Sequence, residues 1–449
     1  MRQAEVRPKP RARARRETLA SRGRALVGLA LACCLVATGC VHRAALAPSG
    51  APGGRTSPPA GRPATPEATP EATPTRLPSV DGAAVSGTVR AQVTDLVSRS
   101  IVELSTRSGP DDPRYFQGGV WVSGQDDCFR CNVGPGLAAA ALAGASGDPR
   151  AFNLAIQTFD HAIAAHRQPD GSFGPPAPGE GGPSIQTMMF ANELGTALVV
   201  LKSQLDAARI RTWTMALTGA ADYLIHNKDL SFYANGNIAL GNAVVMAFAY
   251  RVSGQAGYRT AYEQALSFTL EPDQKRWAGY GLTYSRTPTR ADGADGAGYL
   301  GESAGGTPGF DPEYTVLQAD VATRLFWVTQ DPRALRLMNL FMNQLLPRID
   351  TTSWTLDASN GSRHPEANRS VGFNSPVLAV LAWKGGRSDL APLVGSQIAT
   401  IVRNFRGALT YSNPGMYFDF GSELASLLLA IWGGGMKTDG LPRFGSNRL

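Results

Sequence analysis

The chain has 449 residues, of which 43% are hydrophobic and 18% charged, with 50 glycines, 31 prolines and five cysteines. This composition supports a large core and excludes a disordered acidic protein, a collagen and a disulfide-dense mini-domain. The net charge of +7 comes from the first 24 residues, which hold nine Lys and Arg against two Glu, because the rest of the chain is balanced. A uniformly basic nucleic-acid surface is therefore not expected.

The N-terminal segment is typical of an export signal. Residues 25–38 are apolar or small, and this run is too short to span about 30 Å of hydrocarbon. It leads into Ala37-Thr38-Gly39-Cys40, which resembles the lipobox of bacterial lipoproteins. The resemblance implies that the signal peptide 1–39 is removed and that Cys40 carries the lipid. Because Leu is commoner than Ala37 in a lipobox, plain secretory cleavage stays the alternative.

The export route is left open by the sequence. Arg15-Arg16-Glu17-Thr18-Leu19 resembles part of a twin-arginine signal, although Thr18 replaces the usual aromatic residue. The Sec and twin-arginine routes have the same destination, so we expect a protein lipid-anchored to the outer face of the bacterial cell membrane.

A proline-rich segment follows the signal. Residues 41–80 contain nine prolines, and this composition favours extended chain over a packed core. We predict a lipidated tether at 40–84, a folded domain at 85–434 and a C-terminal tail at 435–449. No other apolar stretch approaches a membrane span, so Cys40 is the expected membrane contact.

The folded part is predicted to be all-α. Apolar periodicity and breakers indicate twelve helices, at about 86–106, 133–145, 148–166, 184–203, 206–227, 236–253, 255–270, 312–330, 332–347, 374–384, 387–405 and 415–433. Short links alternate with long ones along this series. Short links join antiparallel neighbours, so five hairpins are explicit, and the last helix could pair with the first as a sixth.

This alternation resembles the (α/α)6 toroid shared by many glycoside hydrolases and polysaccharide lyases, and also by terpene cyclases and prenyltransferases. The resemblance implies that the long loops meet at one end, the mouth, where the inner helices begin. An open helical array is the alternative. Within 276–300, alternating aromatic residues indicate a short β-hairpin over the funnel instead of a helix.

The first long loop carries candidate binding residues and two cysteines. Trp121 and Asn132 are candidates for contact with substrate. Cys128 and Cys131 have the spacing of a redox or metal motif, but an exported chain without a second cysteine pair favours a local disulfide over a metal site.

A second candidate segment precedes the helix at 236–253. It holds Tyr233, Asn235 and Asn237, and one of these two asparagines is expected to cap the helix. In toroidal polysaccharide lyases an Asn binds the substrate uronate and a Tyr or His moves protons, and this segment resembles such a patch in residue type and place.

The loop 348–373 supplies a candidate base. His364 has an unperturbed pKa near neutrality, and Arg363 beside it could neutralise a uronate. An exposed loop histidine without a role is the alternative.

Carboxylates are also expected at the mouth. Asp126, Asp127, Glu302, Asp311 and Glu313 could supply the acid and base of a glycoside hydrolase. Helix capping by Asp311 and a favourable dipole contact of Glu313 are the structural alternatives. Other candidates at this rim are Tyr314, a proton donor, and Tyr417, which could contact substrate.

The turn Gln168-Pro169-Asp170-Gly171-Ser172-Phe173-Gly174 resembles the Gln-rich aromatic turn of terpene cyclases. It occurs once, without the Asp-rich motif of those enzymes, and we interpret it as a turn between two helices.

These features predict a surface-tethered carbohydrate-active enzyme with a polysaccharide substrate, acting as a monomer and without a cofactor or dedicated metal site. Elimination on a uronate-containing glycan is slightly favoured, with His364 as base, Tyr233 or Tyr314 as acid, and an Asn with Arg363 binding the carboxylate. Hydrolysis by two carboxylates is the second hypothesis. A non-catalytic glycan-binding or cell-wall scaffold lipoprotein is the third.

Overall fold

A computed structural model of the chain describes residues 87–105, 116–117, 120–121, 129–174, 182–271, 278–304, 307–359, 361, 369–370, 374–404 and 428. The predicted signal, tether and C-terminal tail lie outside these residues. So does the helix predicted at 415–433, apart from Leu428, which is helical and buried.

The described part is mostly helical. Its eleven α-helices are α2 (Gly87–Ser105), α3 (Phe129–Ser146), α4 (Pro149–His166), α5 (Gly182–Leu201), α6 (Ala207–His226), α7 (Gly236–Ser253), α8 (Ala256–Leu270), α9 (Pro312–Thr329), α10 (Pro332–Leu345), α11 (Asn374–Trp383) and α12 (Ala391–Asn404). The predicted ends lie within about four residues of these bounds, with shifts of four residues at the starts of α3 and α12. At α12 a 3-10 turn, Ser388–Leu390, precedes the helix.

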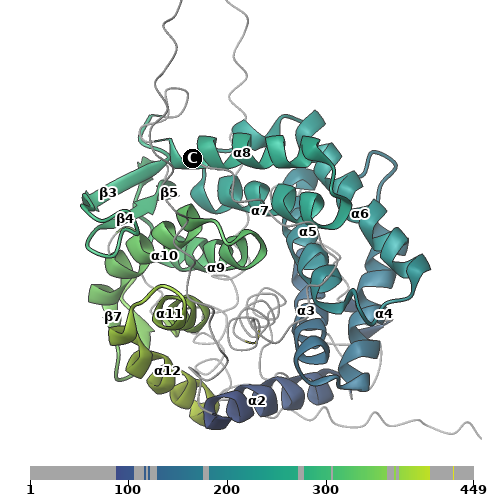
Figure 1. Cartoon of the computed structure of the whole chain (residues 1–449), viewed down its shortest axis with the longest axis horizontal. Coiled ribbons are helices and arrows are strands. Elements are labelled where there is room, and N and C mark those ends of the chain that lie inside the picture. The colour runs from purple at the N-terminus through teal and green to yellow at the C-terminus, as the bar shows by residue number, and fades with distance from the viewer. Residues whose placement is uncertain are drawn as a thin grey trace, which may run out of the picture.

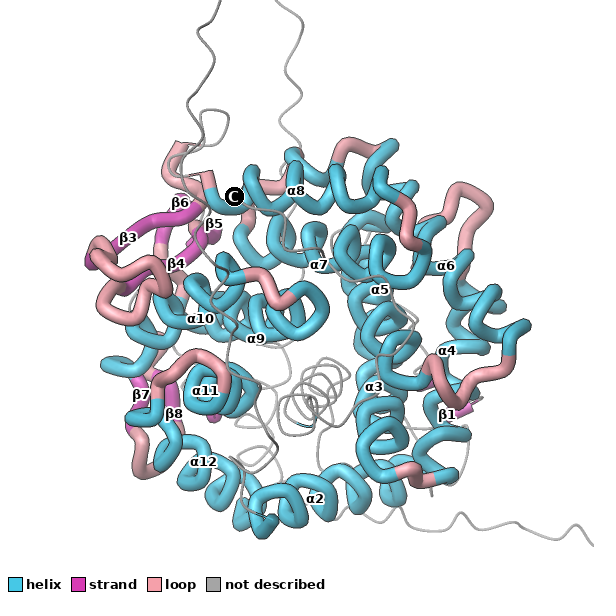
Figure 2. Tube along the Cα trace, in the orientation of Figure 1, coloured by secondary structure: helices cyan, strands magenta, loops and turns pink. Residues whose placement is uncertain are grey.

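The helices form the predicted α/α toroid. Each inner helix packs against the outer helix that follows it and against the next inner helix, in the order α3, α5, α7, α9 and α11. Figures 1 and 2 show these five helices inside a ring, and α12 packs on α2 to close the outer layer of the described chain. The five explicit hairpins are confirmed.

Local sequence signals explain several helix ends. Asp148, Asp311 and Asp331 each cap a helix through the carboxylate and are each followed by a proline at the first helical position. At the other ends, Gly254 after α7 and Gln330 after α9 adopt left-handed conformations.

Small residues let the inner helices pack closely. A side chain at Gly195 of α5 would lie 2.5 Å from the Phe248 ring of α7, and one at Gly241 of α7 would lie 2.4 Å from the Met188 sulfur of α5. Because α7 is buried on every side from Gly236 to Ala249, it shows little amphipathic pattern. None of the described helices is long and apolar enough to cross a membrane.

Short strands occupy several of the long loops. They are β1 (Phe116–Gln117), β2 (Val120–Trp121), β3 (Leu282–Arg286), β4 (Ala297–Leu300), β5 (Glu302–Ala304), β6 (Thr307–Gly309), β7 (Ile349–Asp350), β8 (Thr355–Leu356) and β9 (Arg369–Ser370). All pairings are antiparallel: β1 with β2, β3 with β4, β5 with β6, and β8 between β7 and β9.

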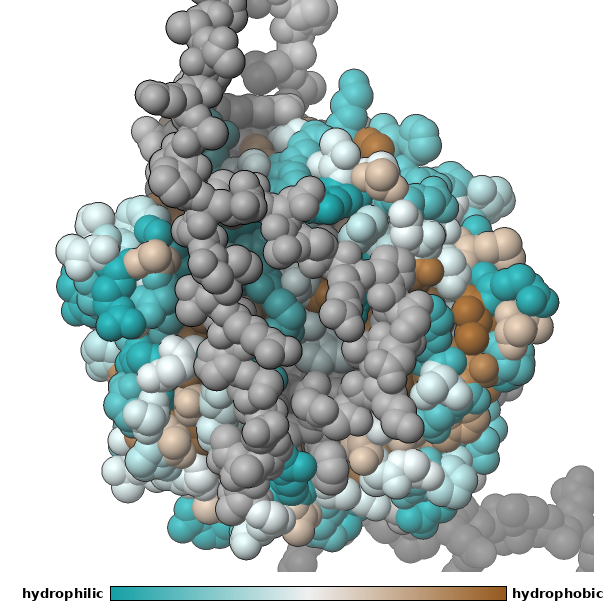
Figure 3. All heavy atoms as spheres, in the orientation of Figure 1, coloured by the Kyte–Doolittle hydropathy of each residue, from teal (hydrophilic) through white to brown (hydrophobic). Residues whose placement is uncertain are grey.

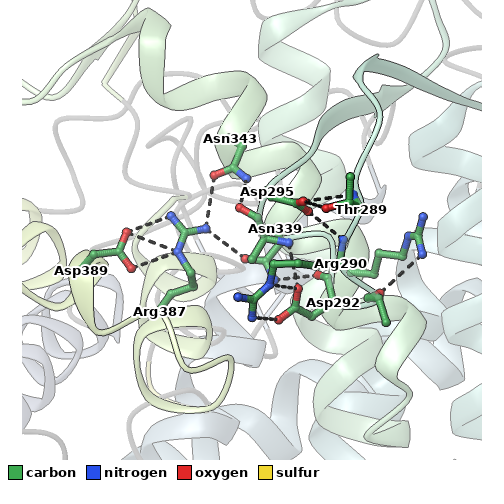
Figure 4. A network of polar contacts seen from close by, with 11 residues as sticks. Thr289, Arg290, Asp292, Asp295, Asn339, Asn343, Arg387 and Asp389 are labelled. Carbon is green, nitrogen blue, oxygen red and sulfur yellow. Dashed lines mark hydrogen bonds and ion pairs between the residues drawn. The ribbon is translucent and has the colours of Figure 1, made fainter.

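The β3–β4 hairpin confirms the prediction for 276–300, but its place differs from the expected one over the funnel. Its loop lies against outer helix α10, where Asn339 Nδ2 donates to Asp292 O (2.9 Å) and Asn343 Nδ2 donates to Gly296 O (2.7 Å). Arg387 donates to both asparagine side chains (Figure 4). Polar groups on one face of α10 therefore hold the hairpin outside the ring, and no pattern within 276–300 identifies that partner.

Candidate functional site

A buried glutamate joins the beginning of inner helix α7 to the middle of inner helix α9. Glu302 has no exposed surface, and its Oε1 accepts hydrogen bonds from the Asn237 backbone N–H and from Gln318 Nε2, both at 2.9 Å. Its Oε2 accepts from Asn235 Nδ2 at 2.9 Å. This set of residues, Glu302 with Asn235, Asn237 and Gln318, is called the Glu302 cluster below. Three donors from two helices are a suitable environment for a buried ionised carboxylate.

Backbone contacts explain why Glu302 reaches this position. The amide of Gln318 pairs with both backbone groups of Leu300, at 3.0 and 3.2 Å, and the Gly236 N–H donates to Gly301 O at 3.1 Å. These bonds fix the end of β4 between α7 and α9. Glu302, two residues after Leu300, is therefore placed beside the first turn of α7.

The cap of α7 differs from the expectation. Asn235 occupies the N-cap position, but its side chain makes no capping hydrogen bond. The Glu302 carboxylate accepts the Asn237 N–H instead, while Asn237 Oδ1 accepts from the Ile238 N–H at 2.8 Å. A negatively charged group at a helix N-terminus is favourable there, and here it comes from a distant strand.

The first turn of α9 brings further candidates to the same end of the ring. Asp311 Oδ1 accepts the Tyr314 N–H at 3.2 Å, which confirms the predicted cap. Glu313 is 7% exposed and Tyr314 is buried, and both lie in this turn. Because β6 leads into this turn and pairs with β5, Glu302 and Glu313 belong to one continuous region.

Aromatic residues precede the Glu302 cluster along the chain. Tyr233 is half-buried and meets Phe232 edge to face, with ring centroids 5.2 Å apart. Phe232 is 39% exposed and, with Met215, is one of the two large hydrophobic residues exposed in the described part of the chain. On the face shown in Figure 3, hydrophobic residues lie in small separate groups. The segment entering α7 thus presents an aromatic surface next to polar groups, a combination suited to sugar rings.

A second buried carboxylate, Asp229, lies in the 3-10 turn Asp229–Ser231 between α6 and α7. Its two oxygens accept from Asn227 Nδ2 at 3.0 and 3.1 Å, and the same amide donates to Ser184 Oγ at 2.9 Å. Asn242 Nδ2 of α7 donates to Asp229 O at 3.0 Å. Burial raises the pKa of Asp229, although hydrogen bonds from Asn227 and Ser184 act in the opposite direction.

The raised pKa of Asp229 predicts a pH dependence of stability. The folded chain holds the Asp229 proton more tightly than the unfolded chain, so this contribution is present below the ordinary value of 3.8 and is lost as pH rises through the raised pKa. Asp229→Asn removes the titration. We measure the free energy of unfolding in urea for both chains from about pH 4 to about pH 7. As pH rises, the wild-type chain should lose stability relative to Asp229→Asn, because only the wild type has the Asp229 carboxyl to deprotonate. A difference that stays constant over this range would contradict the assignment.

Several predicted site residues lie outside the described residues: Asp126, Asp127, Arg363, His364, Tyr417, Cys40 and Cys128. The backbones of Trp121, Cys131 and Asn132 are described, in β2 and in the first turn of α3, but nothing is known of their side chains. The roles predicted for these residues, including the disulfide, stay predictions.

The described start of the loop that carries Arg363 and His364 packs near α9. Gly361 has φ +95°, and a side chain there would lie 2.5 Å from Phe310 O. Trp354, with φ +56°, is buried and donates from Nε1 to Ser396 Oγ at 3.2 Å. The described part of this loop is therefore anchored on both α12 and the start of α9.

The turn at 168–174 joins α4 to α5 as predicted. Phe173 is buried and stacks on Phe190 of α5 with centroids 4.2 Å apart, while its N–H donates to Thr187 Oγ1 at 2.8 Å. These contacts give the aromatic residue a packing role.

Sequence reasoning missed Gln318, Ser184 and Asn227 as partners of the buried carboxylates. Gln318 lies in the middle of α9, where a polar residue on a buried face was the available signal. Among the described residues, no group of three or more His, Cys, Asp and Glu side chains is placed to hold a metal ion.

Comparisons with known proteins give likenesses of fold. No protein-family model matches the chain, and no curated protein matches it. A family 76 glycoside hydrolase from a bovine Bacteroides thetaiotaomicron strain is 11% identical, with a TM-score of 0.45, over 76% of this chain and 78% of that one.

Two further structures are similar at the same level. An unsaturated glucuronyl hydrolase from Streptococcus agalactiae is 10% identical, with a TM-score of 0.46, over 80% of this chain and 97% of that one. Chondroitin AC lyase from Streptomyces coelicolor A3, in complex with chondroitin sulphate, is 15% identical, with a TM-score of 0.44, over 75% of this chain and 46% of that one. At these sequence identities and TM-scores, the comparisons assign neither catalytic residues nor a substrate to this chain.

Proposed function

We propose that the chain is a surface-tethered carbohydrate-active enzyme that cleaves an extracellular polysaccharide at the mouth of the toroid. The observation that carries the proposal is that three buried carboxylates lie where inner helices begin: Glu302 at the first turn of α7, and Asp311 and Glu313 at the start of α9. The half-buried Asn235 donates to Glu302, and the half-buried Tyr233 lies two residues before it in the chain. Buried carboxylates next to polar and aromatic side chains are the groups that glycosidic bond cleavage needs.

Hydrolysis is the chemistry that the described residues support better. A carboxylic acid can protonate the leaving oxygen, and a second carboxylate can activate water or attack the sugar. Glu313 is our candidate for one of these roles, because it lies in the first turn of α9 and is 7% exposed, whereas Glu302 and Asp311 have no exposed surface. Asp127 is the candidate for the other role.

Elimination is the second candidate function, favoured by the two tyrosines. Tyr233 and Tyr314 lie at the beginnings of α7 and α9, where a proton donor to the leaving oxygen is needed. Against it, the Asn235 amide that would bind a uronate is held by the Glu302 carboxylate. This mechanism would depend on Arg363 and His364.

The test uses the full-length chain purified in detergent and incubated with a panel of neutral and acidic polysaccharides. Reducing ends and the ultraviolet absorbance of an unsaturated uronate product are followed together. Reducing ends alone are expected and support hydrolysis, whereas both signals together indicate elimination. Binding without any product would contradict an enzyme and favour the glycan-binding scaffold.

The proposed membrane attachment has a separate test. We expect Cys40→Ser to remove lipid labelling and release the chain from the membrane fraction, because the thiol is the acceptor in the lipobox that residues 37–40 resemble. A chain that stays membrane-bound after this substitution would contradict the anchor.

A further inference from the structure

We infer that Glu302 is a positioning residue that orients the amide of Asn235, so that Asn235 Oδ1 is the acceptor for a hydroxyl group of a neutral sugar. This inference rests on the proposed function and names the substrate class at one point of that site. It follows from the hydrogen-bond chemistry of two side chains and from the difference in their burial.

The carboxylate decides which way the Asn235 amide faces. An ionised carboxylate can only accept hydrogen bonds, so the atom of Asn235 that lies 2.9 Å from Glu302 Oε2 must be Nδ2. Oδ1 is then directed away from Glu302. Within the described part of the chain, Oδ1 of Asn235 accepts no hydrogen bond.

Glu302 is itself held in place, so it can impose this orientation. Its other oxygen accepts from Asn237 N on α7 and from Gln318 Nε2 on α9. Donors from two helices restrain rotation of the carboxylate. Since Glu302 has no exposed surface whereas Asn235 is half-buried, Asn235 is the part of this cluster that substrate can contact.

Asn237 is less suited to the same task. It is buried, and its Oδ1 already accepts the Ile238 N–H at 2.8 Å. Of the two asparagines proposed from the sequence, Asn235 therefore has the acceptor available for substrate.

The chemistry of this acceptor selects a neutral sugar. A hydroxyl of either a neutral sugar or a uronate can donate to Oδ1, but the carboxylate of a uronate has no proton to donate and would be repelled by the buried negative charge of Glu302, 2.9 Å from Asn235 Nδ2. A neutral sugar avoids this repulsion. The described part of this site thus favours a hydroxyl-bearing, uncharged residue at the position next to Asn235.

The test is a pair of substitutions in the full-length chain. In Glu302→Gln, the new oxygen can still accept from Asn237 N and Gln318 Nε2, but the new NH2 group faces Asn235. Asn235 must then turn Oδ1 inward and present N–H groups to substrate. We expect KM for a neutral glycan to rise about tenfold with little change in kcat, because the hydroxyl proton loses its acceptor even though the hydroxyl oxygen can still accept from the new N–H group.

The double variant Asn235→Asp with Glu302→Gln is the matched control. Asp at 235 accepts from the new NH2 with one oxygen and presents the other to substrate, so we expect KM to return to within about threefold of wild type. If Glu302 were only structural, restoring an acceptor at position 235 would not restore KM. Urea unfolding shows whether each variant is folded, and Asn235→Leu, which removes the acceptor alone, provides a second measurement should Glu302→Gln not fold.

The outcomes separate the inference from the proposed function. A folded Glu302→Gln chain or Asn235→Leu chain with wild-type KM would overturn the inference, as would a folded double variant that does not recover. Preference of the wild-type chain for uronate-rich glycan over neutral glycan would overturn the neutral-sugar class while the enzyme stands. A wild-type chain that neither binds nor cleaves any glycan would contradict the proposed function, and the inference with it.

Discussion

Glu313→Gln is expected to lower turnover of the cleaved glycan by about a hundredfold or more, the usual range for removing a general acid or base. The side chain lies in the first turn of α9, the helix that also carries Gln318 of the Glu302 cluster, and is 7% exposed. Gln keeps the shape of the side chain but can neither donate nor take up a proton at neutral pH. The measurement is kcat from the release of reducing ends at saturating substrate.

The control for this variant is Asp95→Asn, which removes an exposed carboxylate on outer helix α2. Asp95 forms an exposed ion pair with Arg99 at 2.9 Å, and such pairs contribute little to stability. Its turnover should stay within about twofold of wild type. Glu313→Gln should also lose a few tenths to about 1 kcal/mol from the helix dipole, so unfolding must be measured beside activity.

Turnover above about one third of the wild-type value would remove Glu313 from the chemistry. Asp127→Asn and His364→Ala then distinguish the two mechanisms, since the first residue is needed for hydrolysis and the second for elimination. These three variants assayed together assign the reaction without knowledge of the glycan sequence.

Helices could be predicted from the sequence because their signals are local. Asp-Pro pairs begin α4, α9 and α10, and each carboxylate accepts backbone N–H groups within three residues. The alternation of short and long links then defines the hairpins, because two helices joined by a short link pack antiparallel to each other.

The Glu302 cluster could not be assembled in the same way. Glu302 and Asn235 are 67 residues apart, and no local pattern connects a strand in one loop with the start of a helix in another. One of Asn235 and Asn237 was expected to cap α7 because Asn is common at that position. The tertiary contact overrides this preference, since Glu302 brings a full negative charge to the same N–H groups.

The β3–β4 hairpin illustrates the same limit. Its strands follow from alternating residues within 282–300, but its place depends on Asn339 and Asn343 of α10. Polar residues on a helix normally indicate a solvent-facing side, so their role in holding a hairpin is apparent only when the two elements are seen together (Figure 4).

Gly236→Ala is expected to destabilise the chain by about 3 kcal/mol, at the upper end of overpacking costs. A Cβ at this position would lie 2.2 Å from Leu300 Cβ and 2.8 Å from Gln318 Nε2. Leu300 cannot move away easily, because both of its backbone groups are bonded to Gln318. The measurement is the urea midpoint of unfolding, converted to free energy with the denaturant slope.

Gly257→Ala is the matched control, because Gly257 also lies in the first turn of a helix, α8, and an added Cβ there meets nothing within 4 Å. Alanine in open space should stabilise the chain by about 0.5–1 kcal/mol. Opposite signs for the two substitutions would establish that α7, β4 and α9 are in close contact at Gly236. Equal stabilisation by both substitutions would mean that α7 begins farther from β4, and the Glu302 cluster could not then form with the distances described.

Gly236→Ala should also affect substrate binding. The added Cβ pushes α7 away from β4 and from Gln318 of α9, and these elements hold Glu302 in place. We therefore expect Gly236→Ala to raise KM for a neutral glycan, as Glu302→Gln does, which links the packing of the ring to its proposed substrate contact.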